Sequence, residues 1–190
     1  MPAADRRAVV ALLERHGVPT IGAQALRRWG VALRERTLRT RQGLAMILRA
    51  GTGEPLGEIL SGTSEQVEAG PLLRRMQPGE RYVSVHTHPG GQSFSAHDAA
   101  VLVAHHQRLI VVAVVGAQGV WYVLSVNPDR APASPGEVYD AHFQEYDALA
   151  PAYAQLVQPG TLTRREAQRQ HTHAIWEHIA PALGLRYDRA

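Results

Sequence analysis

Two histidines and one aspartate are the residues of this chain best suited to chemistry. His86 and His88 stand at the end of a predicted strand over residues 81–85. Because side chains alternate along a strand, both imidazoles project from one face. Asp98 follows ten residues after His88, on the first turn of a predicted helix. Two imidazoles and one carboxylate can bind one divalent ion and leave a fourth tetrahedral position for water, as catalytic zinc sites do.

A simpler interpretation of these residues needs no metal. Histidines often end strands as ordinary polar residues, and Ser95 with Asp98 three positions later is a helix-capping pattern. The order of the features favours a metal site, because a strand, His-x-His-Pro, a glycine-rich turn, Ser-x-x-Asp and a helix follow one another. The same ligand types suit other borderline metals, so the residues do not fix the identity of the ion.

This order resembles the JAMM metalloproteases, also called MPN or JAB proteins, over about residues 37–127. The resemblance implies one Zn2+ per chain and hydrolysis of peptide or isopeptide bonds, including those of ubiquitin-like protein conjugates, by metal-activated water. It also implies that Ser95 is catalytic and donates to the oxyanion, while the other three residues bind the metal. The similarity is greatest to JAB domains of phage head or toxin-like proteins. The matching residues are His86, His88, Pro89, Ser95 and Asp98.

The chain departs from the family pattern in two places. Six residues, 89–94, separate His88 from Ser95, where the family usually has seven. The family also places a general-base Glu near the start of the first core strand, which here is the segment 40–42 with no acidic residue. Two other functions are therefore considered: a catalytically inactive metal-binding scaffold of phage or mobile-element origin, and a nucleic-acid-associated module.

Three glutamates could replace the missing base. Glu65 and Glu35 could approach by a loop or from a helix. Glu58 comes third, because pairing of Arg49 with Leu56 in a hairpin would place it opposite Ile47, about 15 Å along the sheet from residue 42.

The remaining histidines are weaker candidates. His171 and His173 repeat the His-Thr-His string, but they lie on a predicted helix, where a two-residue separation is a rotation of about 200°. We expect them to face opposite sides, with His171 on the packed face, rather than to form a second metal site. For His97, His105 and His106, a solvated helix face is favoured over a role near the metal or substrate.

Periodicity predicts the elements that position the site. The fold class is α/β, with a JAMM/MPN-like (cytidine-deaminase-like) mixed sheet flanked by helices. We expect an N-terminal helical arm (1–36), a metal-binding core (37–127), and a linker with a C-terminal helical extension packed on the core (128–190). The predicted helices are 5–16, a stretch around 26–36, 95–106, 138–156 with a bend or break near Pro151, and 163–183; the predicted strands are a hairpin of 44–48 and 56–60, then 81–85, 109–115 and 120–126.

Composition limits the class of protein. With 190 residues, 45% hydrophobic, the chain can bury one core. The lack of cysteine excludes disulfides and thiolate ligands. The sequence shows neither a long apolar run nor a signal-peptide pattern, so we expect a cytoplasmic protein without membrane contact. Residues 1–50 carry ten arginines against three acidic residues, a net charge of +7, which could contact nucleic acid or an acidic partner.

Overall fold

The computed structural model describes residues 5–63, 67–158 and 160–190, which form an α/β fold around one mixed sheet. Six strands lie in the order β2-β1-β3-β4-β5-β6. The strands are β1 (Leu44–Arg49), β2 (Leu60–Ser61), β3 (Tyr82–His88), β4 (Leu109–Gly116), β5 (Trp121–Val126) and β6 (Leu185–Arg189). The helices of the described residues are α1 (Arg6–Arg15), α2 (Thr20–Thr40), α3 (Gly70–Leu73), α4 (Ala96–His105), α5 (Pro135–Val157) and α6 (Arg164–Ile179).

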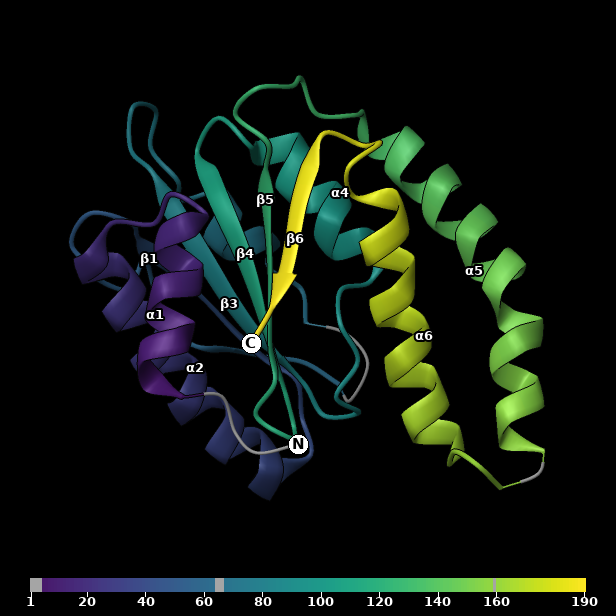
Figure 1. Ribbon diagram of the computed structural model, residues 1–190. Coiled ribbons are helices and arrows are strands. Elements are labelled where there is room, and N and C mark those ends of the chain that lie inside the picture. Colours follow the sequence, from purple (N-terminus) through teal and green to yellow (C-terminus); the bar gives the residue numbers. More distant parts are fainter. Residues whose placement is uncertain (1–4, 64–66, 159) are drawn as a thin grey trace.

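Helices cover both faces of the sheet, so the molecule has three layers (Figure 1). Helices α1 and α2 lie on one face, while α4 and α6 lie on the other, with α5 outside them. Each strand supplies both cores by alternation: Met46, Val85 and Ala113 face α1 and α2, whereas Ile47 and Val112 face the α4 side. The general α/β expectation is confirmed.

The parallel pair at the centre of the sheet positions the His-x-His motif. Strands β3 and β4 are parallel and are connected through α4, whereas the other neighbouring pairs are antiparallel. A parallel pair needs a crossover connection, and here the crossover helix starts directly after the loop that follows His88. The end of β3 and the start of α4 therefore come together over one sheet face.

Glycines let α2 lie close to the sheet. A Cβ atom at Gly30 would overlap the indole ring of Trp121, and one at Gly22 would overlap the carbonyl oxygen of Ala50. Helix α2 continues to Thr40, so the boundary expected after residue 36 falls inside it.

The predicted hairpin was wrong in its second strand. Strand β2 holds only Leu60 and Ser61, instead of residues 56–60. Nearer the turn, Leu48 pairs with Pro55, so Arg49 does not pair with Leu56. Leu56 packs against the core beneath the sheet, and the glycine that follows it sits against α3, which takes this segment out of the ladder.

The C-terminal third also differs in detail. Helix α5 continues through Pro151 without a break. Helix α6 begins at Arg164 as its capping box predicts, but it ends at Ile179 rather than near residue 183. After a turn, residues 185–189 form β6, an edge strand that sequence analysis did not predict. None of the helices in the described parts of the chain is long and apolar enough to cross a membrane.

Candidate metal centre

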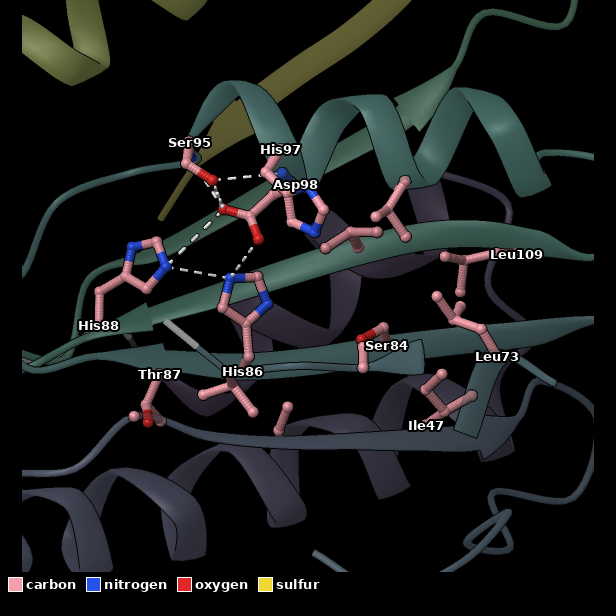
Figure 2. Close-up of a pocket in the computed structure, with 16 residues that line it drawn as sticks. Ile47, Leu73, Ser84, His86, Thr87, His88, Ser95, His97, Asp98 and Leu109 are labelled. Carbon is pink, nitrogen blue, oxygen red and sulfur yellow. Dashed lines mark hydrogen bonds and ion pairs between the residues drawn. The ribbon is translucent and has the colours of Figure 1, made fainter. Parts of the chain in front are cut away.

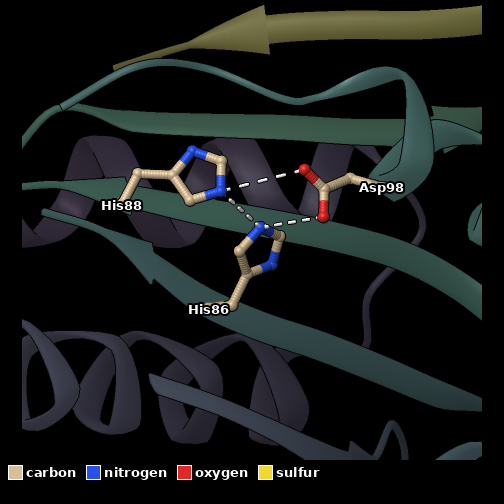
Figure 3. Close-up of side chains that lie close together, drawn as sticks. All are labelled: His86, His88 and Asp98. Carbon is tan, nitrogen blue, oxygen red and sulfur yellow. Dashed lines mark hydrogen bonds and ion pairs between the residues drawn. The ribbon is translucent and has the colours of Figure 1, made fainter. Parts of the chain in front are cut away.

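The two histidines of the motif lie on the α4 side of the sheet because of strand alternation. His86 and His88 share this face of β3 with Ser84, while Thr87 between them points to the opposite face. His86 is 8% exposed, and His88 is partly exposed at the end of the strand. Both imidazoles point toward the start of α4 (Figure 3).

Asp98 carries out the capping role and faces the histidines at the same time. Ser95 is the N-cap of α4, and its hydroxyl donates to Asp98 Oδ2 at 2.7 Å, as does its backbone N–H at 2.8 Å. The other carboxylate oxygen, Oδ1, lies 3.2 Å from His86 Nε2. The capping and metal-ligand interpretations of this aspartate are thus compatible, since each uses a different oxygen.

The distances between the three side chains fit one tetrahedral ion. Nε2 of His86 lies 3.1 Å from Nε2 of His88 and 3.2 Å from Asp98 Oδ1. Ligands bound to zinc at 2.0–2.2 Å with tetrahedral angles are about 3.3 Å apart. His88 Nε2 lies 3.8 Å from the other carboxylate oxygen, Asp98 Oδ2, and one ligand atom from each of the three residues lies within 4.8 Å of the other two. The group could therefore hold a metal ion.

Helix α6 anchors the loop that joins the two halves of the motif. The Ser93 hydroxyl donates to the backbone carbonyl of Thr172 at 2.8 Å, and the indole N–H of Trp176 donates to the carbonyl of Phe94 at 2.7 Å. Gly91 has φ of +83°, and a Cβ there would overlap the side chain of Gln118. The six-residue loop is thus held firmly enough to bring Asp98 over β3.

Contacts on the opposite face fix the position of β3 itself. Thr87 Oγ1 lies 2.6 Å from Thr37 Oγ1 of α2 and accepts the backbone N–H of Leu44 at 3.0 Å. These buried bonds join α2, β1 and β3 directly behind the two histidines. Thr87, the middle residue of His-x-His, therefore helps to position β3, a role that the sequence motif does not indicate.

Local interactions favour the protonation states that bind metal. His88 Nδ1 lies 3.2 Å from the carbonyl oxygen of Gln92, so a proton on Nδ1 leaves Nε2 free as a ligand. Burial and the neighbouring His86 lower the pKa of His88. Burial alone would raise the pKa of Asp98, but His86, His88 and the hydrogen bond from Ser95 outweigh it and hold that pKa well below its ordinary value. The carboxylate is therefore ionised at neutral pH.

The three side chains stand at one end of a cavity of about 390 Å³ (Figure 2). The cavity lies between α4 and the sheet and continues away from the histidines along β1, β3 and β4. Its far walls are apolar and come from four different elements. The apolar residues there include Ile47, Leu73, Val101, Leu109 and Val112.

The predicted catalytic residues are only partly brought together. Ser95 lines the cavity, but its hydroxyl proton is directed to Asp98, so its oxyanion role stays a prediction. Glu35 and Glu58 are exposed and do not line the cavity. Glu65 lies outside the described residues. Among the residues that the structure describes, Asp98 is the only carboxylate of the cavity wall.

The other histidines lie apart from the metal centre, with one exception. His97 lines the cavity, and its Nδ1 is 3.0 Å from the Tyr139 hydroxyl of α5. His171 and His173 are buried but contact different neighbours: the former stacks near Tyr153 of α5, and the latter bonds Tyr187 of β6 at 2.8 Å. In the described part of the chain, just one group of three metal-ligating side chains forms.

No protein-family model, curated protein or solved structure matches this chain. The resemblance of the His-x-His-Pro and Ser-x-x-Asp segments to JAMM proteins therefore stays a prediction. Function has to be inferred from the geometry of the site itself.

Proposed function

We propose that this protein binds one zinc ion through His86, His88 and Asp98 and is a JAMM-like hydrolase of peptide or isopeptide bonds. The observation that supports the proposal is the convergence of three ligand atoms, all within 4.8 Å of one another, at the mouth of a cavity. Three protein ligands with space beside them are the arrangement of catalytic rather than structural zinc sites. A zinc ion there supplies a water whose pKa is lowered to about 7 and a Lewis acid for the substrate carbonyl.

The residues around the ligands orient them. Ser95 holds one oxygen of Asp98 and leaves the other toward His86. The carbonyl of Gln92 fixes the His88 ring, because a hydrogen bond to Nδ1 selects the tautomer with a free Nε2. Both supports keep the ligand atoms in place before an ion arrives, which reduces the ordering needed for binding.

Hydrolysis also requires a proton acceptor for the reacting water. A general base must come within about 3 Å of the reacting water. Glu35 and Glu58 lie away from the cavity in this structure, so Glu65 becomes the first glutamate to test.

A second candidate function is a metal-binding scaffold without turnover. It is favoured by the absence of any glutamate from the cavity wall within the described ranges 5–63, 67–158 and 160–190. The two functions share the metal centre and differ in whether a base completes it.

Metal analysis of the purified protein tests the shared part. We expect about one zinc per chain in the parent and a loss of it in His86→Ala, His88→Ala and Asp98→Asn, since two remaining ligands seldom retain zinc. His178→Ala is the matched control, because His178 is exposed on α6 and pairs with Glu145. Full zinc content in the three ligand variants would refute the site.

Turnover measurements separate the two candidates. The zinc-loaded parent and its Glu65→Gln, Glu35→Gln and Glu58→Gln variants are assayed on peptides and ubiquitin-like conjugates, with zinc content measured in the same samples. One variant that loses turnover and retains zinc would identify the base. A zinc-loaded parent that cleaves none of these substrates would favour the scaffold.

A further inference from the structure

We infer that the cavity beside the metal centre is a binding pocket for one aliphatic or aromatic side chain of the substrate, next to the bond that is cleaved. This inference rests on the proposed hydrolase function and narrows its substrate class. It disfavours conjugates that end in glycine, since a glycine tail has no side chain to fill the space. Its basis is the shape, depth and chemistry of the cavity walls.

The cavity extends along the strands from the ligands. Ala45 lies opposite His86 in the sheet, and Ile47 lies opposite Ser84, one step further from the ligands. Leu109 pairs with Tyr82, a further step along. At about 3.3 Å per residue, the Ile47–Ser84 pair lies roughly 7 Å from His86 along the strand, and the Leu109–Tyr82 pair lies roughly 13 Å away. A substrate leucine or phenylalanine can therefore place its side chain beside Ile47 while its backbone remains at the ligands.

Away from Asp98, the described residues of the cavity wall offer no charged partner to a charged side chain. Among the described residues that line the cavity, Asp98 is the only acidic one and none is arginine. Two other polar groups of the wall are already engaged: the Ser84 hydroxyl donates to the carbonyl of Met46, and His97 Nδ1 bonds the Tyr139 hydroxyl. Burying an unpaired charge is costly, whereas burying an apolar side chain against these walls is favourable.

The position of the cavity ties it to the metal centre. His86 and Asp98 form one end of it, and Leu73, Ile47 and Leu109 form the other (Figure 2). Its volume of about 390 Å³ falls in the range of small-ligand pockets. A substrate carbonyl at the ligands would therefore carry a neighbouring side chain directly into the apolar end.

Methyl NMR on the metal-free protein tests the pocket without any turnover. N-acetyl-leucinamide and N-acetyl-phenylalaninamide should shift the methyl signals of Ile47, Leu109 and Val112 saturably. N-acetyl-glycinamide and N-acetyl-argininamide should bind on the order of 10- to 100-fold more weakly, the factor expected for burial of one apolar side chain. Equal shifts with all four probes, or none at these methyls, would overturn the inference.

Two variants that fill the cavity and one matched control test whether the probes bind in the cavity. Val101→Trp from α4 and Leu73→Trp from α3 replace partly exposed wall residues, so each should abolish the shifts while the remaining spectrum stays dispersed. Val31→Trp changes a partly exposed valine of α2 on the other side of the sheet and should bind the probes as the parent does. Unchanged binding in both filled and folded variants would place the probes elsewhere and refute the pocket.

Cleavage by the zinc-loaded protein provides an independent readout. Peptides with leucine or phenylalanine beside the scissile bond should show kcat/KM on the order of 10- to 100-fold above glycine and arginine peptides. Preferred cleavage of glycine-tailed conjugates would overturn the inference. Probe binding in the NMR experiment without cleavage of any substrate would support the pocket and contradict the hydrolase.

Discussion

Ser95 joins the start of α4 to the candidate metal centre. Its hydroxyl donates to Asp98 Oδ2 and accepts the backbone N–H of Asp98 at 3.2 Å. Ser95→Ala should cost about 1 kcal/mol of stability, since an N-cap is lost. It should also weaken zinc affinity about 10-fold, because the ligand loses its orienting partner. Chelator competition and urea denaturation measure the two effects.

Ser95→Thr is the control for this change, because threonine retains the hydroxyl and the capping ability. It should restore most of the affinity and stability. A direct oxyanion role would appear differently, as a fall in kcat of the alanine variant at saturating zinc. Unchanged zinc affinity in the alanine variant would contradict the orienting role.

His142 of α5 is a histidine with an evident cost to stability. Both of its ring nitrogens are buried without a hydrogen-bond partner among the described residues. Burial, and then the nearby His171, lower the pKa of His142. Below about pH 6.5 the unfolded chain takes up a proton that the folded chain resists. The cost of burying His142 is therefore smallest above that pH and grows as the pH falls toward the lower folded pKa.

Replacing His142 by leucine should stabilise the protein. We expect His142→Leu to raise the free energy of unfolding by about 1 kcal/mol at pH 7, since a buried unsatisfied group is removed, and by more at pH 5. Urea denaturation at both pH values measures this. His178→Leu, at an exposed and ion-paired position, should change stability by less than about 0.5 kcal/mol. Equal gains in both variants would refute the explanation by burial.

The convergence of the candidate ligands was predictable at the residue scale, whereas the cavity walls were not. Alternation along a strand and the short distance to the next helix were enough to bring His86, His88 and Asp98 together in a prediction. Val101, Leu109 and Val112 gave no such signal, because apolar residues in regular elements are normally core. Their role depends on a space that only the packing of α4, α3 and the sheet creates.

At the scale of elements, the close approach of α2 to the sheet depends on a glycine. Alanine in a helix interior is normally favoured over glycine by about 1 kcal/mol. At Gly30, however, the added methyl would overlap the Trp121 indole and also press on Val115. Gly30→Ala should therefore destabilise the protein by about 1–3 kcal/mol, the usual cost of overpacking, as measured by thermal or urea denaturation.

Gly136 provides the matched control for this prediction. It lies in the first turn of α5, where the nearest atom to an added Cβ is Ser134 Oγ at 4.0 Å. Gly136→Ala should leave stability unchanged or raise it by up to about 1 kcal/mol. A loss of similar size at both positions would show that packing against Trp121 is not the cause.

Element prediction succeeded where signals were local and failed where partners were distant. The capping patterns at Ser95 and Thr163 located the starts of two helices. Strand β6 was missed, although Leu185 and Tyr187 alternate with charged residues, because its partner β5 lies about sixty residues earlier in the chain. The second hairpin strand was overpredicted, since Leu56 packs into the core and only Leu60, of its five residues, pairs with β1.

At the scale of the whole molecule, the N-terminal and C-terminal parts of the described chain are both joined to the sheet. His16, at the end of α1, bonds Ser125 of β5 at 2.7 Å and Asp188 of β6 at 2.9 Å. Helix α6 contributes Ile175 and Trp176 to the same core as β4 and α4. Both terminal parts thus share cores with the central region of the chain instead of forming cores of their own.

The three tryptophans make this integration measurable. Trp29 lies in α2, Trp121 in β5 and Trp176 in α6, so each reports on a different third of the chain. Variants that keep one tryptophan and carry phenylalanine at the other two positions should each unfold in urea in a single transition. Within each variant, the fluorescence midpoint should coincide with the midpoint from far-UV circular dichroism, because a shared core unfolds cooperatively. Comparison within one variant removes the effect of the substitutions on stability. A Trp29 or Trp176 signal that changes at clearly lower urea than the circular dichroism would instead show that the corresponding terminal part unfolds separately.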